Sequence, residues 1–112
     1  MDVRLPAHLE VSAMIRAVDA AGGFATVLKK GEREAGTILV ILCEKGAGSV
    51  LYERMPDMDL GRKWTEVRRQ DSQNPFDFND YVDRRKIQDA DCWVVELDVA
   101  NGQQFVAGMA DR

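Results

Sequence analysis

The feature that most constrains the fold is the segment Ile38–Cys43, in which six consecutive residues are apolar. It is the longest apolar stretch in the chain, and it falls far short of the ~20 residues that a membrane-spanning helix needs. A short apolar run without alternating polar positions is typical of a strand that is covered on both faces. We therefore expect a central strand at 37–43 in the sheet of a globular protein.

Apolar periodicity predicts the elements around this strand. Residues 6–21 repeat apolar positions every three or four residues and are followed by Gly22–Gly23, a pattern typical of an amphipathic helix and its end. A second helix is expected from about Asp77 to Lys86, after which Ile87 would turn back into the core. Further strands are expected at 24–30, 49–55, 62–70 and 92–99, and the turn signal Asn101–Gly102 predicts a short hairpin partner at Phe105–Val106.

This order of elements predicts the α+β class, because strands and helices do not alternate. We expect one domain over residues 1–112: a twisted, mostly antiparallel sheet of four to six strands with two helices on one face, in the order α-β-β-β-β-α-β-β. The strands up to residue 55 would form an antiparallel meander, with Gly31–Gly36 as a hairpin loop between the first two. The strand at 62–70 has no apolar face and is expected to be an edge strand or an exposed ribbon.

Charge and cysteine usage exclude several classes of protein. With 15 basic and 19 acidic residues the formal net charge is −4, unlike that of strongly basic nucleic-acid-binding proteins. The first residues lack the basic and apolar regions of a signal peptide, so a cytoplasmic location and no membrane association are expected. Cys43 and Cys92 both lie in apolar runs and are expected to be buried thiols. The single histidine and the two cysteines are too far apart in sequence for a zinc site, and no metal or cofactor is predicted.

No motif predicts catalysis. Gly31 and Gly36 have the spacing of a phosphate-binding loop, but the required lysine is missing and the segment joins two predicted strands, so we interpret it as a turn. His8 is the only histidine and is interpreted as a surface residue near the terminus. Asp80 and Asp83 are neighbours on the second helix and are interpreted as part of its solvated face. No catalytic residue is assigned.

Two basic clusters supply the candidate binding residues. Arg62, Trp64 and Arg68 follow one another on one face of the predicted edge strand, and Arg84 and Arg85 end the second helix, where they also complement its dipole. Trp64 could be a stacking platform for bases, an anchor at a protein interface or a lid on the core. The negative net charge opposes binding to nucleic acid, which is therefore not the expected partner.

Much of the chain resembles a small alphaproteobacterial family known as domain of unknown function 1491. The resemblance covers roughly residues 4–106 and is carried by the segments Leu5–Arg16, Gly23–Gly31, Tyr81–Lys86 and Ile87–Leu97. The chain departs from the family pattern at Ala90, where relatives carry proline, and at Cys92, where they carry leucine. Because the family has no assigned activity, cofactor or catalytic residue, the resemblance implies only a small cytoplasmic bacterial protein.

These observations leave two classes of function open. The leading hypothesis is a non-catalytic module that binds another protein or a second copy of itself. The alternative is an enzyme or small-molecule-binding protein with a pocket between helices and sheet that uses Tyr52, Tyr81 or Arg85, or weak binding of nucleic acid or a phosphoryl ligand by 62–69. The segment 56–75 is the expected functional or mobile region. A pocket with convergent polar groups would favour the alternative, and an exposed apolar patch would favour the leading hypothesis.

Overall fold

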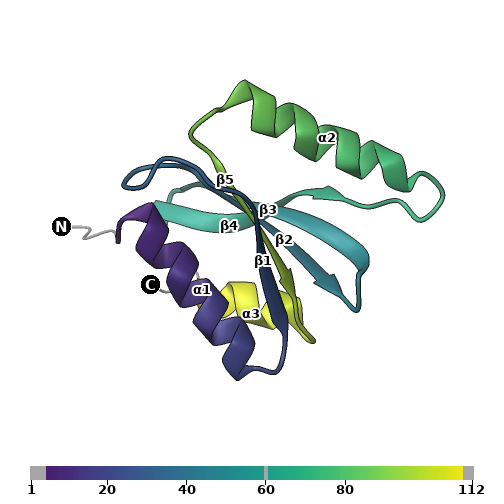
Figure 1. The fold of residues 1–112 in the computed structure, drawn as a ribbon, viewed down its shortest axis with the longest axis horizontal. Coiled ribbons are helices and arrows are strands. Elements are labelled where there is room, and N and C mark those ends of the chain that lie inside the picture. The colour runs from purple at the N-terminus through teal and green to yellow at the C-terminus, as the bar shows by residue number, and fades with distance from the viewer. Residues whose placement is uncertain (1–4, 60, 110–112) are drawn as a thin grey trace.

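The computed structural model describes residues 5–59 and 61–109 (Figure 1). In these ranges the elements are α1 (Ala7–Ala20), β1 (Phe24–Lys29), β2 (Ile38–Glu44), β3 (Ala47–Asp57), β4 (Gly61–Arg69), α2 (Pro75–Gln88), β5 (Trp93–Asp98) and α3 (Gly102–Met109). The strands form one sheet in the order β1-β5-β2-β3-β4, in which β2 and β5 pair in parallel and all other neighbours pair antiparallel. The predicted α+β class and the mostly antiparallel sheet are confirmed. None of the helices in the described ranges has the length and apolar content needed to cross a bilayer.

The strand predicted to be central, β2, lies in the middle of the sheet, and β5 lies beside it. All of Ile38–Cys43 in β2 is buried, and in β5 every residue of Trp93–Leu97 except Glu96 is buried. Alternate side chains of these strands enter two separate cores, one on each face of the sheet. Continuous apolar sequence therefore marks the strands that need a cover on both sides.

The two main helices cover opposite faces of this sheet, and the prediction that both lie on one face is wrong (Figure 1). α1 packs Val11, Met14 and Val18 against the face that includes Val40, which we call the α1 side, and α3 lies on the same side. α2 packs Phe78 and Val82 against the other face, the α2 side. The physical reason is that β2 and β5 are apolar on both faces, so helices on one side alone would leave a second apolar surface in water.

β1 does not form a hairpin with β2, because β5 lies between them. The segment Gly31–Gly36 crosses the start of β5 and is tied to it: the indole N–H of Trp93 donates to the Glu32 carbonyl at 2.7 Å, and the Glu32 N–H donates to the Asp91 carbonyl at 2.8 Å. A Cβ atom on Gly31 or Gly36 would lie 2.2 or 2.4 Å from the Asp91 carbonyl oxygen. The glycines thus permit close backbone packing, and the predicted hairpin loop is a crossover segment.

Two local predictions in the second half of the chain are also wrong. The expected hairpin after Asn101 is the helix α3, in which the Asn101 carbonyl accepts the N–H groups of Gln104 and Phe105 at 3.1 and 3.2 Å. The helical turn brings Phe105 and Val106 together onto the α1-side core, which a hairpin would not. Ile87 does not return to the core, because α2 continues through it and leaves it 83% exposed.

β3 and β4 form a longer hairpin than expected. β3 extends to Asp57 and β4 starts at Gly61, so three of the six positions 56–61, which lie between the expected strands, belong to strands or their ends. β4 is an edge strand, as predicted from its lack of an apolar face. The segment 56–75 therefore contains the end of β3 and the whole of β4. Its role in function stays a prediction.

Candidate functional site

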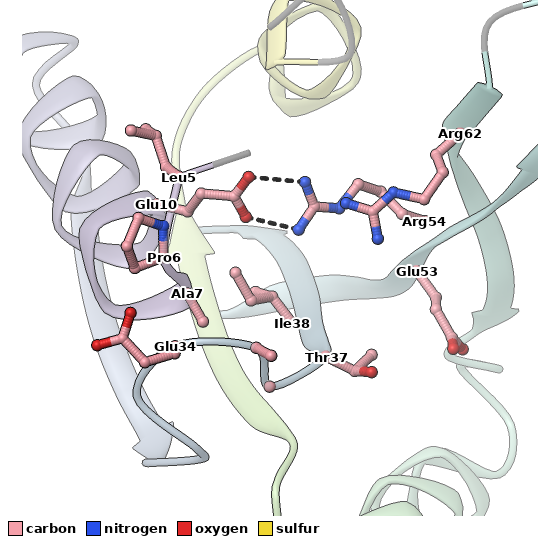
Figure 2. A pocket seen from close by; sticks show the side chains of 12 residues that line it. Leu5, Pro6, Ala7, Glu10, Glu34, Thr37, Ile38, Glu53, Arg54 and Arg62 are labelled. Atoms are coloured by element: carbon pink, nitrogen blue, oxygen red, sulfur yellow. Dashed lines mark hydrogen bonds and ion pairs between the residues drawn. The ribbon is translucent and has the colours of Figure 1, made fainter. Parts of the chain in front are cut away.

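A cavity of about 360 Å³ lies on the α1 side, where the start of α1, the crossover segment and the β3–β4 hairpin meet (Figure 2). Its walls combine apolar and charged side chains: Leu5, Pro6, Ala7 and Ile38 with Glu10, Glu34, Glu53, Arg54 and Arg62. In Figure 2, Glu10 and Arg54 point toward each other across the cavity, whereas Glu53 points away from them. The charged groups that could contact a ligand here thus come from α1, the crossover segment, β3 and β4.

The centre of this site is an ion pair between α1 and β3. The two terminal nitrogens of Arg54 contact the two carboxylate oxygens of Glu10 at 2.8 and 2.5 Å, and both side chains are less than 20% exposed. The Arg54 guanidinium also lies over the Trp64 ring, 4.8 Å from its centroid. A two-pronged, partly buried contact of this kind is stronger than a surface ion pair and fixes the helix to the hairpin. A ligand in the cavity would have to compete with Glu10 for Arg54.

A β-bulge separates the predicted binding residues of β4 onto two faces. Tyr52 pairs with Glu66 and Leu51 pairs with Arg68, so Val67 is an extra residue in β4. The extra residue shifts the alternation of side chains by one position, which places Arg68 on the α2 side and leaves Trp64 on the α1 side. The prediction that both lie on one strand face is wrong for this reason.

On the α2 side, arginines tie α2 to the hairpin. Arg68 contacts Asp77 at 2.7 Å and lies over the Tyr81 ring, 4.8 Å from its centroid. Arg85 contacts Glu53 at 2.9 Å and donates to the Tyr81 hydroxyl at 3.4 Å. The hydrogen bond to Glu53 raises the pKa of Arg85 above its usual range. These side chains hold α2 in place over β3 and β4.

The five predicted binding residues therefore do not form one patch. Arg62 lines the α1-side cavity, Trp64 is buried in the α1-side core, Arg68 and Arg85 form ion pairs on the α2 side, and Arg84 is exposed on α2. With only 6% of its surface exposed, Trp64 has no free ring face for stacking and covers the core. A binding role for the arginines stays a prediction.

The polar residues expected to line one pocket are also divided by the sheet. Tyr52 is 8% exposed on the α1 side, where burial raises the pKa of its hydroxyl, whereas Tyr81 and Arg85 lie on the α2 side. The His8 ring contacts the Arg33 carbonyl through Nδ1 at 3.0 Å and helps to fix the start of α1. Within 5–59 and 61–109, no cluster of three or more histidine, cysteine or carboxylate side chains is placed to hold a metal ion.

Cys43 and Cys92 are free and buried, as predicted. Burial, with added repulsion from Glu96 and Asp98, raises the pKa of the Cys43 thiol to about 11, and burial also raises the pKa of Cys92. At pH 8 we expect Cys43 to react with a thiol reagent roughly a hundredfold more slowly than an ordinary cysteine, because a rise of two pKa units lowers the thiolate fraction by that factor. Absorbance during reaction with dithionitrobenzoate should reveal two thiols only after denaturation. Fast labelling of the native protein would contradict the burial of these thiols.

An exposed apolar patch lies on β1, which is the other edge of the sheet. Phe24, Val27 and Leu28 expose 70%, 37% and 42% of their surfaces, and we call them the β1 patch. Leu28 also lines a groove of about 340 Å³ beside Phe78 and Val82 of α2. Sequence reasoning missed this patch because it did not predict the complete strand order, so it could not identify the first strand as an edge. The apolar residues were visible in the sequence, but their position at an edge depends on strand order.

Together these features define a small α+β protein with a five-stranded sheet covered by helices on both faces and one apolar edge. The chain belongs to the family described as Protein of unknown function (DUF1491), whose model matches residues 5–107. This confirms the resemblance seen in the sequence.

Solved structures of similar proteins share this fold. A crystal structure of a DUF1491 family protein from Caulobacter crescentus CB15 is 32% identical, with a TM-score of 0.72 over 85% of this chain and 88% of that one. An NMR structure of a DUF1491 family protein from the same organism is 30% identical, with a TM-score of 0.75 over 94% of both chains. A solution structure of a protein from A. tumefaciens is 31% identical, with a TM-score of 0.68 over 88% of this chain and 89% of that one. No curated protein matches the chain.

Proposed function

We propose that this protein is a non-catalytic binding module that takes up an extended strand of a protein partner along β1. The observation that carries the proposal is the β1 patch, in which Phe24, Val27 and Leu28 are exposed on an edge strand. An edge strand offers unpaired backbone N–H and C=O groups, and apolar side chains on it add affinity for a strand that pairs there.

The contrast between the two edges of the sheet supports this assignment. β4 carries charged side chains along most of its length: Arg62, Lys63, Glu66, Arg68 and Arg69. Charged edges of this kind discourage pairing with other chains. β1 has no charged residue from Phe24 to Leu28. Lys29 follows, but its ammonium group is turned back onto the carbonyls of Ala90 and Cys92, at 2.7 and 2.8 Å.

A small-molecule site in the α1-side cavity is the second candidate, because charged side chains converge there. We rank it below strand binding, since Arg54 is already engaged by Glu10 in a two-pronged contact. Binding of nucleic acid or a phosphoryl ligand through 62–69 has less support, because Trp64 is buried and Arg69 pairs with Glu66. We place the protein in the cytoplasm, where reducing conditions suit two free thiols.

Photo-crosslinking in living alphaproteobacterial cells tests strand binding at β1. With benzoylphenylalanine in place of Phe24 or Leu28, we expect covalent adducts to a protein, identified by mass spectrometry. The same group in place of Lys63 on the charged edge is the matched control and should give none. Adding Leu28→Lys to the position-24 variant should remove its adduct, because a buried charge disfavours pairing. No adducts at 24 and 28, or equal adducts at 63, would refute the proposed function.

A further inference from the structure

Resting on the proposed function, we propose that the strand taken up by β1 is β1 of a second copy of this chain. The two strands would pair antiparallel about Thr26, and one continuous sheet would run through both copies. The dimer would have a two-fold axis perpendicular to the sheet, the symmetry most common among homo-oligomers. The binding partner is thus the apolar strand β1 of an identical chain.

The sequence of β1 is complementary to itself in one register. Residues directly opposite in an antiparallel pair share a face of the sheet. A two-fold axis perpendicular to the sheet must therefore pass midway between one residue and the same residue of the second copy. When the axis passes between the two copies of Thr26, Phe24 lies opposite Leu28 of the second copy, which is the bulged residue between Val27 and Lys29 of β1. An axis one residue earlier or later would place Phe24 opposite Thr26 or Lys30. The register about Thr26 therefore pairs apolar side chains with apolar side chains.

The faces on which these side chains lie agree with this register. Phe24 pairs with Asp98 of β5, which places it on the α2 side, and Leu28 lines the α2-side groove beside Phe78. Phe24 of the second copy would therefore lie over Leu28 at the mouth of that groove. On the α1 side, the same register places Val27 opposite Ala25, which packs against the α1-side core.

Charge is complementary at both ends of the paired strands. Because Leu28 is a bulged residue, the exposed Lys30 would lie near Gly22–Gly23 of the second copy, next to the end of its α1. The last turn of α1 contains Asp19 and no basic residue, and the carboxyl end of a helix favours a nearby cation. The Lys29 ammonium group does not oppose pairing, because it is held by carbonyls of its own chain. Two-fold symmetry repeats this contact at the other end.

The oligomeric state of the full chain tests the proposal. By sedimentation velocity over a wide concentration range we expect a monomer–dimer equilibrium. Phe24→Lys should weaken dimerisation at least about tenfold, because each dimer loses two buried aromatic side chains. Phe76→Lys is the matched control: this phenylalanine on α2 is 74% exposed, as against 70% for Phe24, and its replacement should leave dimerisation unchanged.

Cysteine scanning tests the register. Opposite Cα atoms in an antiparallel pair are about 4.5–5.5 Å apart, which a disulfide can span. Under mild oxidation Thr26→Cys should therefore form a covalent dimer. Ala25→Cys and Val27→Cys should not, because in this register each lies two residues away from its copy. The native Cys43 and Cys92 are buried and do not interfere.

The outcomes separate this inference from the proposed function. A dimer that Phe24→Lys weakens and Thr26→Cys traps supports pairing of two β1 strands. A dimer unaffected by Phe24→Lys, or one trapped through positions 25 or 27 instead, overturns the proposed interface. A monomer at every concentration whose position-24 crosslinker captures a different protein overturns the second copy as the occupant while leaving strand binding at β1 intact. A monomer without adducts overturns both.

Discussion

Trp64→Ala is expected to lower the free energy of unfolding by about 3–5 kcal/mol, as for other buried aromatic residues truncated to alanine. The side chain is 6% exposed in the α1-side core, and the Arg54 guanidinium lies over its ring. The substitution would leave a cavity and deprive Arg54 of one of its two contacts. Urea unfolding followed by far-ultraviolet circular dichroism measures the loss without depending on tryptophan fluorescence.

Lys63→Ala is the control for this substitution, because Lys63 is the exposed neighbour of Trp64 on the same strand. We expect its effect to stay within about 0.5 kcal/mol. A Trp64→Ala protein of nearly unchanged stability that no longer self-associates would show that Trp64 is an interface anchor instead. Phe24→Lys should behave in the opposite way, with its stability retained and its association weakened.

Gly31→Ala is expected to destabilise the protein by about 3 kcal/mol, at the upper end of the usual cost of overpacking. The new Cβ would lie 2.2 Å from the Asp91 carbonyl oxygen and 2.6 Å from the carbonyl carbon of Cys92. Both are backbone atoms immediately before β5, so neither can rotate away as a flexible side chain would. Equilibrium unfolding in urea measures the difference from the wild-type chain.

Gly46→Ala is the control that distinguishes the cost of close packing from the cost of backbone conformation. Gly46 has a φ of +75°, and nothing lies within 4 Å of a Cβ built there. Alanine at this position would therefore destabilise the protein only through the left-handed backbone conformation, by about 1–2 kcal/mol. Gly31 has no such φ, and its cost would come from the contact with β5 alone. A Gly31→Ala protein as stable as the wild type would show that the crossover segment can move away from β5.

The ion pairs of Arg68 and Arg85 explain why the basic residues suggested a binding role in the sequence but do not form one binding site in the fold. In the sequence Arg68 and Arg85 are separate members of basic runs, whereas in the fold both contact Tyr81. Each is matched by a carboxylate, Asp77 or Glu53, from an element that is distant in sequence or separated by a loop. Charge that looks available in a sequence can thus be used to dock one element onto another.

Local patterns alone determined the elements of this protein other than α3, and they identified its most buried strands. The unbroken apolar run at Ile38–Cys43, the pattern at Trp93–Leu97 and the helical repeat around Val11 and Val18 each encode burial within a few residues of chain. The same locality explains why both cysteines could be predicted to be buried. The α+β class followed from the order of these elements, and family membership was visible in the residues themselves.

Strand order and the assignment of side chains to faces were decided only by the tertiary structure. Backbone N–H and C=O groups are the same in every strand, so nothing within β1 or β2 specifies that β5 should separate them. One extra residue, Val67, moves Arg68 to the opposite face from Trp64. The local sequence does not predict this bulge. The exposure of Phe24 and the burial of Trp64 both follow from which strands become edges and which face a helix covers. These are properties of contacts between distant segments, and only the folded chain brings those segments together.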